Sequence, residues 1–170
     1  MKLRAIPVSS MLFATLLLGA CASTPPAPGA GAQVDARSGS TVSGNVTFSD
    51  LGGAVQVDAK FAGLTPGEHG FHVHEAGDCS AADASSAKGH YNPAGQRHGH
   101  HDSKVRHGGD MPNLVANAQG EARLSAELKG LTVSELVGRS VVVHADPDDY
   151  MSQPAGNSGK RIACGVIAAR

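Results

Sequence analysis

Histidines alternate with apolar side chains in one short stretch of the sequence, Gly70–His74, and this alternation is typical of a β-strand. Successive side chains on a β-strand point to opposite faces, so His72 and His74 share one face while Phe71 and Val73 share the other. Two imidazoles on one face can hold a metal ion together, and neutral imidazole suits copper, zinc, iron or nickel. Alone, the pair is equally typical of a polar strand face, so the case for a metal site depends on the other histidines.

Most of the nine histidines lie between His69 and His107. The segment from Glu75 to about Pro112 is rich in Gly, Asp, Ser, Ala, Asn and His and shows little apolar periodicity. A stretch of this length without regular structure is uncommon in a compact domain unless it is functional. A bound metal can supply the order that a missing core cannot. The potential ligands in this segment are His90, His98, His100, His101, His107 and Asp110.

Short alternating segments with Gly-containing turns surround the histidine-rich segment, and this pattern predicts an all-β fold. The expected strands cover residues 41–48, 54–64, 70–74, 114–118, 121–128, 139–144 and 162–168. Residues 131–137 fit either a short helical turn or a loop. About eight short strands with two long functional loops, 75–112 and 145–160, predict an eight-stranded antiparallel Greek-key barrel or sandwich. A chain of 170 residues can bury a real core in one domain.

The N-terminal segment has the features of an export signal. Lys2 and Arg4 precede an apolar run, Met11–Leu18, that is too short to span a membrane comfortably. The sequence Leu18-Gly19-Ala20-Cys21 resembles a bacterial lipobox, whose cysteine is lipidated; an ordinary secretory peptide cut nearby is the alternative. Both readings predict export. We therefore expect a signal peptide at 1–20, a flexible Pro/Ala/Gly-rich tether at 21–32 and the folded domain at 33–170.

The cysteine count and the charge fit an exported protein. Three cysteines leave an unpaired thiol in an oxidising compartment, but lipidation of Cys21 would leave Cys79 and Cys164 as a pair. A disulfide between them would stabilise the fold by about 4 kcal/mol in the chain-entropy model. Without Lys2 and Arg4 the net charge is about −3, and the sequence has no Lys/Arg cluster of the kind that binds nucleic acid.

Five motifs, taken in order, resemble those of the copper/zinc superoxide dismutases, specifically the secreted bacterial lipoprotein type. The similarity runs from about Gln33 to the C-terminus, and the fixed order of the motifs makes it specific. The motifs are Gly70–Glu75, Gly89–Pro93, His107–Asp110, Val142–His144 and Gly156–Ile167.

The resemblance implies two metal sites that share His90. The ligands it implies are His72, His74, His90 and His144 for copper, and His90, His98, His107 and Asp110 for zinc. Nitrogen ligands serve both oxidation states of copper, while three imidazoles and a carboxylate suit closed tetrahedral zinc. The loop offers three histidines where the zinc site needs one. His98 is favoured because it lies eight residues after His90 and nine before His107, so we expect His100 and His101 to be solvated loop residues.

The implied reaction is dismutation of superoxide to dioxygen and hydrogen peroxide, which would protect the cell envelope. In this reading His90 donates a proton and Arg161 holds the anionic substrate. Asp148 would link a copper ligand to a zinc ligand through hydrogen bonds, although Asp146 and Asp149 lie close enough in sequence to compete. The resemblance also pairs Cys79 with Cys164 in a disulfide. His69 is expected to bind backbone groups beneath the copper site.

Two rival classes are a non-catalytic copper-buffering protein and a chaperone-like relative that has lost ligands. The presence of every expected ligand, together with Arg161, favours the enzyme. The expected partners are superoxide as substrate and a membrane reached through lipidated Cys21, with the protein in the periplasm or cell envelope. The sequence leaves open whether the chain is a monomer or a homodimer, and which membrane leaflet would hold it.

Overall fold

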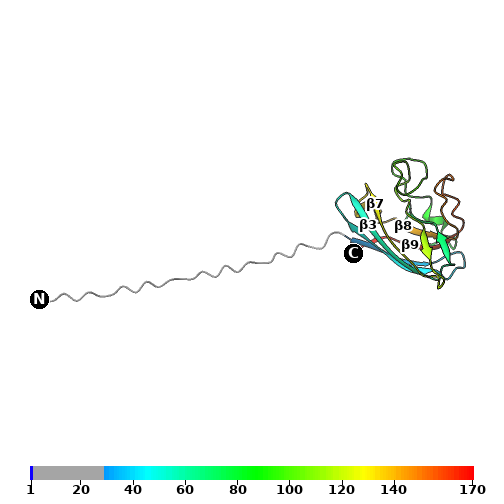
Figure 1. Ribbon diagram of the computed structural model, residues 1–170, viewed down its shortest axis with the longest axis horizontal. Helices are drawn as coiled ribbons and strands as arrows, with labels where there is room; N and C mark the ends of the chain where they lie inside the picture. Colours follow the sequence, from blue (N-terminus) through cyan, green and yellow to red (C-terminus); the bar gives the residue numbers. More distant parts are fainter. Residues whose placement is uncertain (2–28) are drawn as a thin grey trace.

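The computed structural model describes Met1 and residues 29–170, and the regular structure of this part consists of ten antiparallel strands and two short helical segments. The all-β antiparallel barrel expected from the sequence is confirmed (Figure 1). The strands are β1 (Gly29–Ala36), β2 (Ser43–Asp50), β3 (Ala54–Ala62), β4 (Gly67–His69), β5 (Phe71–His74), β6 (Leu114–Ala116), β7 (Ala122–Lys129), β8 (Ser140–His144), β9 (Arg161–Val166) and β10 (Ala168–Ala169). The helical segments are η1 (Ser85–Ala87) and α1 (Val133–Leu136).

The chain itself nearly closes the barrel at Gly70. The strand order is β4-β6-β7-β3-β2-β1-β9-β8-β5, so its two ends, β4 and β5, are separated in the chain only by this glycine. The Gly70 N–H donates to the Asp146 carbonyl at 2.9 Å, and its own carbonyl accepts from the His144 N–H at 2.8 Å. A Cβ at Gly70 would press against the side chain of Ser158. The strand that carries His72 therefore starts from a fixed point.

The core lies between the β2–β3–β7 side of the barrel and the β5–β8–β9 side. Alternation in β3 buries Val55, Val57, Ala59 and Phe61, while the residues between them are more exposed. The ring of Phe61 meets that of Phe71 from β5 edge to face, with centroids 5.5 Å apart. The apolar face of β5 therefore packs into the core, and the opposite face is left for its histidines.

The first strand corrects the predicted domain boundary. β1 begins at Gly29, so residues 29–32 belong to the barrel and not to the tether expected at 21–32. Ala30 and Ala32 are buried there, but Gly and Ala have low β-propensity and gave no strand signal. The predicted signal peptide and the rest of the tether lie outside the described residues. Among the residues described, no helix has the length and apolar character needed to cross a membrane.

The segment at 131–137 contains one helical turn, α1, between two stretches of loop. A capping box fixes its start, because the Glu135 carboxylate accepts the Thr132 backbone N–H at 2.8 Å and the Thr132 side chain caps the first turn. Val133 and Leu136 are buried beneath this turn. The helical alternative predicted for this segment is the one the structure shows.

Two long loops carry the remaining functional residues and lie together on the β8–β9 side of the molecule (Figure 1). Gln153 of the second loop joins them: its Oε1 accepts the His98 N–H, and its Nε2 donates to the His98 carbonyl, both at 2.9 Å. The predicted disulfide is confirmed and ties Cys79 in the first loop to Cys164 in β9, with Cα atoms 5.7 Å apart. Both loops are thereby held against the barrel.

Candidate metal centre

Four histidines from three parts of the chain meet at one end of β5. His72 and His74 project from β5, His144 ends β8, and His90 comes from the first long loop, where it forms an isolated bridge with His74. A bulge between Val143 and His144 shifts the register of β8 against β9. Each of the four side chains is buried, and each offers a ring nitrogen within 4.8 Å of the others.

Each of these imidazoles uses one nitrogen for a protein contact, which turns the other nitrogen toward the common centre. His72 Nε2 binds Asp148 Oδ2 at 2.8 Å, His74 Nδ1 binds the Lys88 carbonyl at 2.9 Å, and His90 Nδ1 binds Asp110 Oδ1 at 2.9 Å. The nitrogens without a hydrogen-bond partner among the described residues are His72 Nδ1, His74 Nε2, His90 Nε2 and His144 Nε2. Buried polar atoms are rarely left unpaired, so four that converge fit a metal ion.

A second ligand set lies on the other side of the His90 ring. It comprises His90, His98, His107 and Asp110, all buried and with ligand atoms within 4.8 Å of one another. His107 Nδ1 lies 3.4 Å from both His90 Nδ1 and Asp110 Oδ1. Three imidazoles and one carboxylate are the donors of a closed zinc site. His90 therefore belongs to both sets, with the unpaired Nε2 on the side of the first set and Nδ1 on the side of the second, and it would be the ligand that two bound metals share.

Burial and the two aspartates set the charge of the metal-free ligands. Burial lowers the pKa of His74 and of His144 well below the ordinary value, and burial with the nearby His72 lowers the pKa of His90 to about 4. Burial also acts to lower the pKa of His98, but hydrogen bonds to Asp110 and Asp148 outweigh it and raise this pKa to about 9. Zinc binding at neutral pH must therefore displace a proton from His98.

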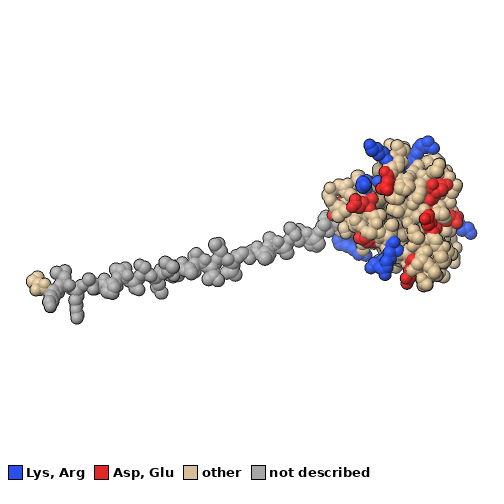
Figure 2. All heavy atoms as spheres, in the orientation of Figure 1, with Lys and Arg blue, Asp and Glu red and all other residues tan. Residues whose placement is uncertain are grey.

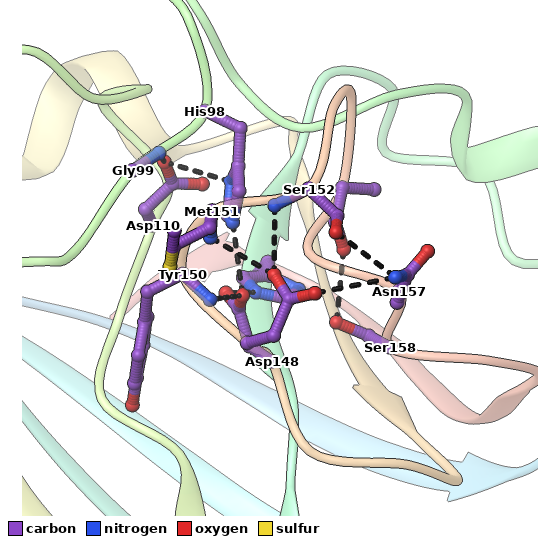
Figure 3. Close-up of polar contacts among 12 residues, drawn as sticks. His98, Gly99, Asp110, Asp148, Tyr150, Met151, Ser152, Asn157 and Ser158 are labelled. Atoms are coloured by element: carbon purple, nitrogen blue, oxygen red, sulfur yellow. Dashed lines mark hydrogen bonds and ion pairs between the residues drawn. The ribbon is translucent and has the colours of Figure 1, made fainter.

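Asp148, and neither Asp146 nor Asp149, contacts both ligand sets (Figure 3). Its Oδ2 accepts from His72 Nε2 at 2.8 Å, and its Oδ1 accepts from His98 Nε2 at 2.9 Å. Asp149 Oδ1 instead accepts backbone N–H groups from its own turn, including that of Met151. One carboxylate therefore orients a ligand of each metal.

Asn113 supports Asp148 and was missed at the level of sequence. Its Nδ2 donates to the Asp148 carbonyl and its Oδ1 accepts the Asp148 N–H, both at 3.0 Å. The hydroxyl of Tyr150 accepts the Asn113 backbone N–H at 2.9 Å. A single polar residue just before β6 carries no periodic signal, which is why its contact with a loop 35 residues later could not be anticipated.

Arg161 begins β9 directly opposite His144. Its Nη1 donates to the Ala84 carbonyl at 2.8 Å, which fixes the half-buried guanidinium. Its positive charge contributes to lowering the pKa of His74 and of His144, although burial is the larger cause. A cavity of about 280 Å³ beside Arg161 also has Lys160 and Asp83 in its wall.

Three further histidines lie outside both ligand sets. His69 Nδ1 binds the His144 carbonyl at 2.8 Å and its Nε2 binds the Thr65 carbonyl at 2.9 Å, so it supports the backbone beside the copper set. His100 is exposed and His101 is partly exposed on the first loop. The zinc set uses His98, as its spacing predicted, and neither of these neighbours.

A nearly closed antiparallel barrel with two ligand sets that share one imidazole defines a dinuclear metalloprotein with one redox-suited and one zinc-suited site. The family model for copper/zinc superoxide dismutase matches residues 42–167. The chain belongs to this family. The ligand sets predicted for copper and for zinc are confirmed, and the enzyme dismutates superoxide.

Relatives from distant sources are similar over most of the chain. "Superoxide dismutase [Cu-Zn]" of Paramecium bursaria Chlorella virus 1 is 43% identical over 136 residues, which cover 74% of this chain and 72% of the relative. "Superoxide dismutase [Cu-Zn] 2" of Aquifex aeolicus (strain VF5) is 41% identical over 135 residues, covering 74% and 79%. The crystal structure of the clock protein EA4 superposes with a TM-score of 0.75 at 37% identity, covering 86% of this chain and 97% of that one.

Proposed function

We propose that this enzyme removes superoxide in the cell envelope, after export, while a lipid on Cys21 holds it at a membrane. The observation that carries the proposal is the sequence Leu18-Gly19-Ala20-Cys21 after a short apolar run with a positive start. The disulfide between Cys79 and Cys164 supports it, because such bonds persist in oxidising compartments and this pairing leaves Cys21 as the remaining cysteine.

The position of β1 sets how far the barrel can stand from the anchor. Because β1 begins at Gly29, only residues 22–28 separate it from Cys21. A chain of this length spans at most about 25 Å when fully extended. A lipidated Cys21 would therefore keep the barrel close to the membrane surface. One lipid chain alone binds a membrane weakly, so this proposal requires the multiple acylation typical of lipoproteins.

In the proposed mechanism two superoxide ions and two protons yield one dioxygen and one hydrogen peroxide. Bound copper supplies the one-electron redox chemistry, and bound zinc supplies a fixed positive charge. Arg161 holds the anionic substrate beside the ligand His144 through its guanidinium donors. His90 carries one of the protons on Nε2, the nitrogen that faces the copper set. Asp110 keeps the opposite nitrogen of this ring in place at 2.9 Å.

Positive charge at Arg161 has to act locally. The mature chain would carry a net charge of about −3, and basic and acidic side chains are interspersed over the face shown in Figure 2. An overall negative protein repels superoxide, whereas a small group of positive charges at the site can raise its association rate by about 10- to 10³-fold. Arg161 and Lys160 are the positive side chains in the wall of the cavity of about 280 Å³, and Arg161 pairs with the copper ligand His144 between β9 and β8.

The test of the envelope proposal is a Cys21→Ser variant of the full chain, with Ser23→Ala as the control in the same segment. We expect the natural chain and the control to sediment with membranes and to carry lipid by mass spectrometry of the processed N-terminus. The Cys21→Ser variant should keep dismutase activity and lose both properties. Equal membrane association of this variant would refute the anchor, and activity confined to the cytosol with an uncleaved N-terminus would refute export.

A further inference from the structure

Two histidines that the metal centre does not use stand side by side on the first long loop. His100 and His101 have ring centroids 4.0 Å apart, and Asp102 follows them in the same turn. Each of the three residues offers a ligand atom, and these atoms lie within 4.8 Å of one another. The ligand atoms of the copper set and those of the zinc set also lie within 4.8 Å of one another. The group differs from them in being at the surface.

His101 resembles the resident metal ligands in having a buried nitrogen with nothing to bind. Among the described residues, six buried side-chain nitrogen or oxygen atoms lack a hydrogen-bond partner. Five of them belong to ligands of copper and zinc, and the sixth is Nδ1 of His101. Nδ1 therefore makes no hydrogen bond, and the other ring nitrogen of His101, Nε2, faces Asp102 and is the atom that can take a ligand.

The spacing of donors matches that of the zinc site. His101 Nε2 lies 3.4 Å from Asp102 Oδ2, and in the zinc set His107 Nδ1 lies 3.4 Å from Asp110 Oδ1. Two donors on one tetrahedral zinc ion are about 3.3 Å apart, given metal–ligand bonds of about 2.0 Å. Little movement is therefore needed to close this pair around an ion.

Neighbouring residues hold the group in place. The ring of Tyr150, from the second loop, packs 4.6 Å from that of His100 and 5.8 Å from that of His101. The backbone N–H of Tyr150 donates to Asp148 Oδ1 at 2.7 Å, so this support is anchored to the metal centre. The Asp102 N–H donates to His100 Nδ1 at 3.2 Å, which turns that ring back over the same turn.

We propose that His100, His101 and Asp102 form an accessory binding site for a divalent cation of the class that imidazole prefers, Zn²⁺ or Cu²⁺. Water completes the coordination, because the site is open to solvent. Lys104 and Arg106 share with His101 and Asp102 the wall of an adjoining cavity of about 410 Å³, and their charges oppose a cation. The site therefore binds more weakly than the buried centre and exchanges its ion. It is independent of export and lipidation.

The test uses the holoenzyme with its copper and zinc in place, freed of excess metal and titrated calorimetrically with Zn²⁺. We expect one further Zn²⁺ to bind per chain. His101→Ala should abolish this event, Asp102→Asn should weaken it by at least about tenfold, and the matched control Lys104→Ala, on the same exposed turn, should retain it. The chain has two tyrosines and no tryptophan, so Cu²⁺ at this site should also quench the fluorescence of Tyr150.

Elemental analysis of each variant completes the test. We expect the His101→Ala protein to keep one copper and one zinc and to keep its dismutase activity. The proposal is overturned if the natural chain binds no further Zn²⁺, or if the binding persists in a His100→Ala/His101→Ala double variant. Loss of the resident zinc from His101→Ala would also overturn it, because His101 would then belong to the zinc site.

Discussion

At the scale of single residues, the direction of each metal-facing nitrogen depends on what the other nitrogen of the ring binds. Asp148 fixes His72 and His98 at once, and Asp110 contacts His90, His98 and His107. A change in either carboxylate therefore reaches both metals. The two aspartates act as orienting groups as well as charges, which is the usual role of carboxylates around ligating histidines.

Arg161→Glu tests the electrostatic role proposed for this side chain. The change replaces an attractive charge beside His144 with a repulsive one, so the rate constant for superoxide should fall by about 10- to 10³-fold. In the natural chain this rate constant should decrease with added salt. In Arg161→Glu that decrease should weaken or reverse, because salt then screens a repulsion. Pulse radiolysis at several ionic strengths measures both effects. Arg161→Lys, which keeps the charge, is the control, and unchanged kinetics for Arg161→Glu would remove Arg161 from the mechanism.

His98→Ala tests the assignment of the zinc ligand. Removing one of four donors should release most of the zinc, while His100→Ala and His101→Ala keep it, because only His98 lies within the zinc set. Copper should remain, and activity should become more sensitive to pH because zinc no longer restrains His90. Elemental analysis and a pH–rate profile measure the outcome. Zinc loss from either neighbour, with zinc retained in His98→Ala, would contradict the assignment.

At the scale of elements, each long loop needs a rigid partner to place its ligands. β5 and β8 deliver His72, His74 and His144 directly, whereas His90, His98 and His107 depend on a loop with little core of its own. The disulfide supplies part of the missing constraint by joining Cys79 of this loop to Cys164 of β9. Arg37 adds to it, because its Nε donates to the Cys79 carbonyl at 2.8 Å.

Cys79→Ser should lower the free energy of unfolding by about 4 kcal/mol, since the bond closes a loop with a sequence separation of 85 residues. Cys164→Ser should have a similar effect, and the double variant should be no worse than either single one. Denaturant unfolding of the metal-free protein measures this loss, with Ser80→Ala as the neighbouring control. Stability equal to that of the natural chain would show that the disulfide contributes nothing.

At the scale of the whole molecule, the metal-free domain should be most stable near pH 6.5. Burial lowers the pKa of His72, His74, His90 and His144, so these histidines bind protons only in the unfolded chain as the pH falls below 6.5. Stability therefore decreases toward acid. His98 acts in the opposite sense. Burial is outweighed there by hydrogen bonds to two carboxylates, its pKa is raised to about 9, and its stabilising contribution is lost between pH 6.5 and 9.

Denaturant unfolding of the metal-free protein from pH 4 to 10 checks this expectation. His98→Gln should remove the loss of stability on the alkaline side. A decrease toward acid should remain, because burial still lowers the pKa of His72, His74, His90 and His144. A steady rise in the stability of the natural chain up to pH 9 would contradict the raised pKa of His98.

The metal ligands were easier to predict from the sequence than the strand that begins the barrel domain. His72 and His74 followed from strand alternation, and the remaining ligands from ordered motifs whose spacing the loop preserves. β1 escaped notice because three of its four buried positions are alanine or glycine, which lack the branched side chains typical of strands. Asn113 escaped notice because its contact with Asp148 exists only after two distant loops meet. Metal ligands can be found from local sequence patterns, whereas β1 and the Asn113–Asp148 contact depend on tertiary packing.

The first and last residues of the chain that forms the barrel, Gly29 and Arg170, are hydrogen-bonded to each other. The Arg170 N–H donates to the Gly29 carbonyl at 2.9 Å, and β10 pairs with β1 at Ala169 and Ala30. A short glycine linker could therefore join residue 170 to residue 29 and turn the domain into a circular chain. New ends could then be opened at the exposed Gly52–Gly53 turn, which interrupts neither metal-bearing loop. The lipid anchor proposed above, if joined to these new ends, would sit at the tip of the β2–β3 hairpin, and the same metal centre would then face the membrane from a different side.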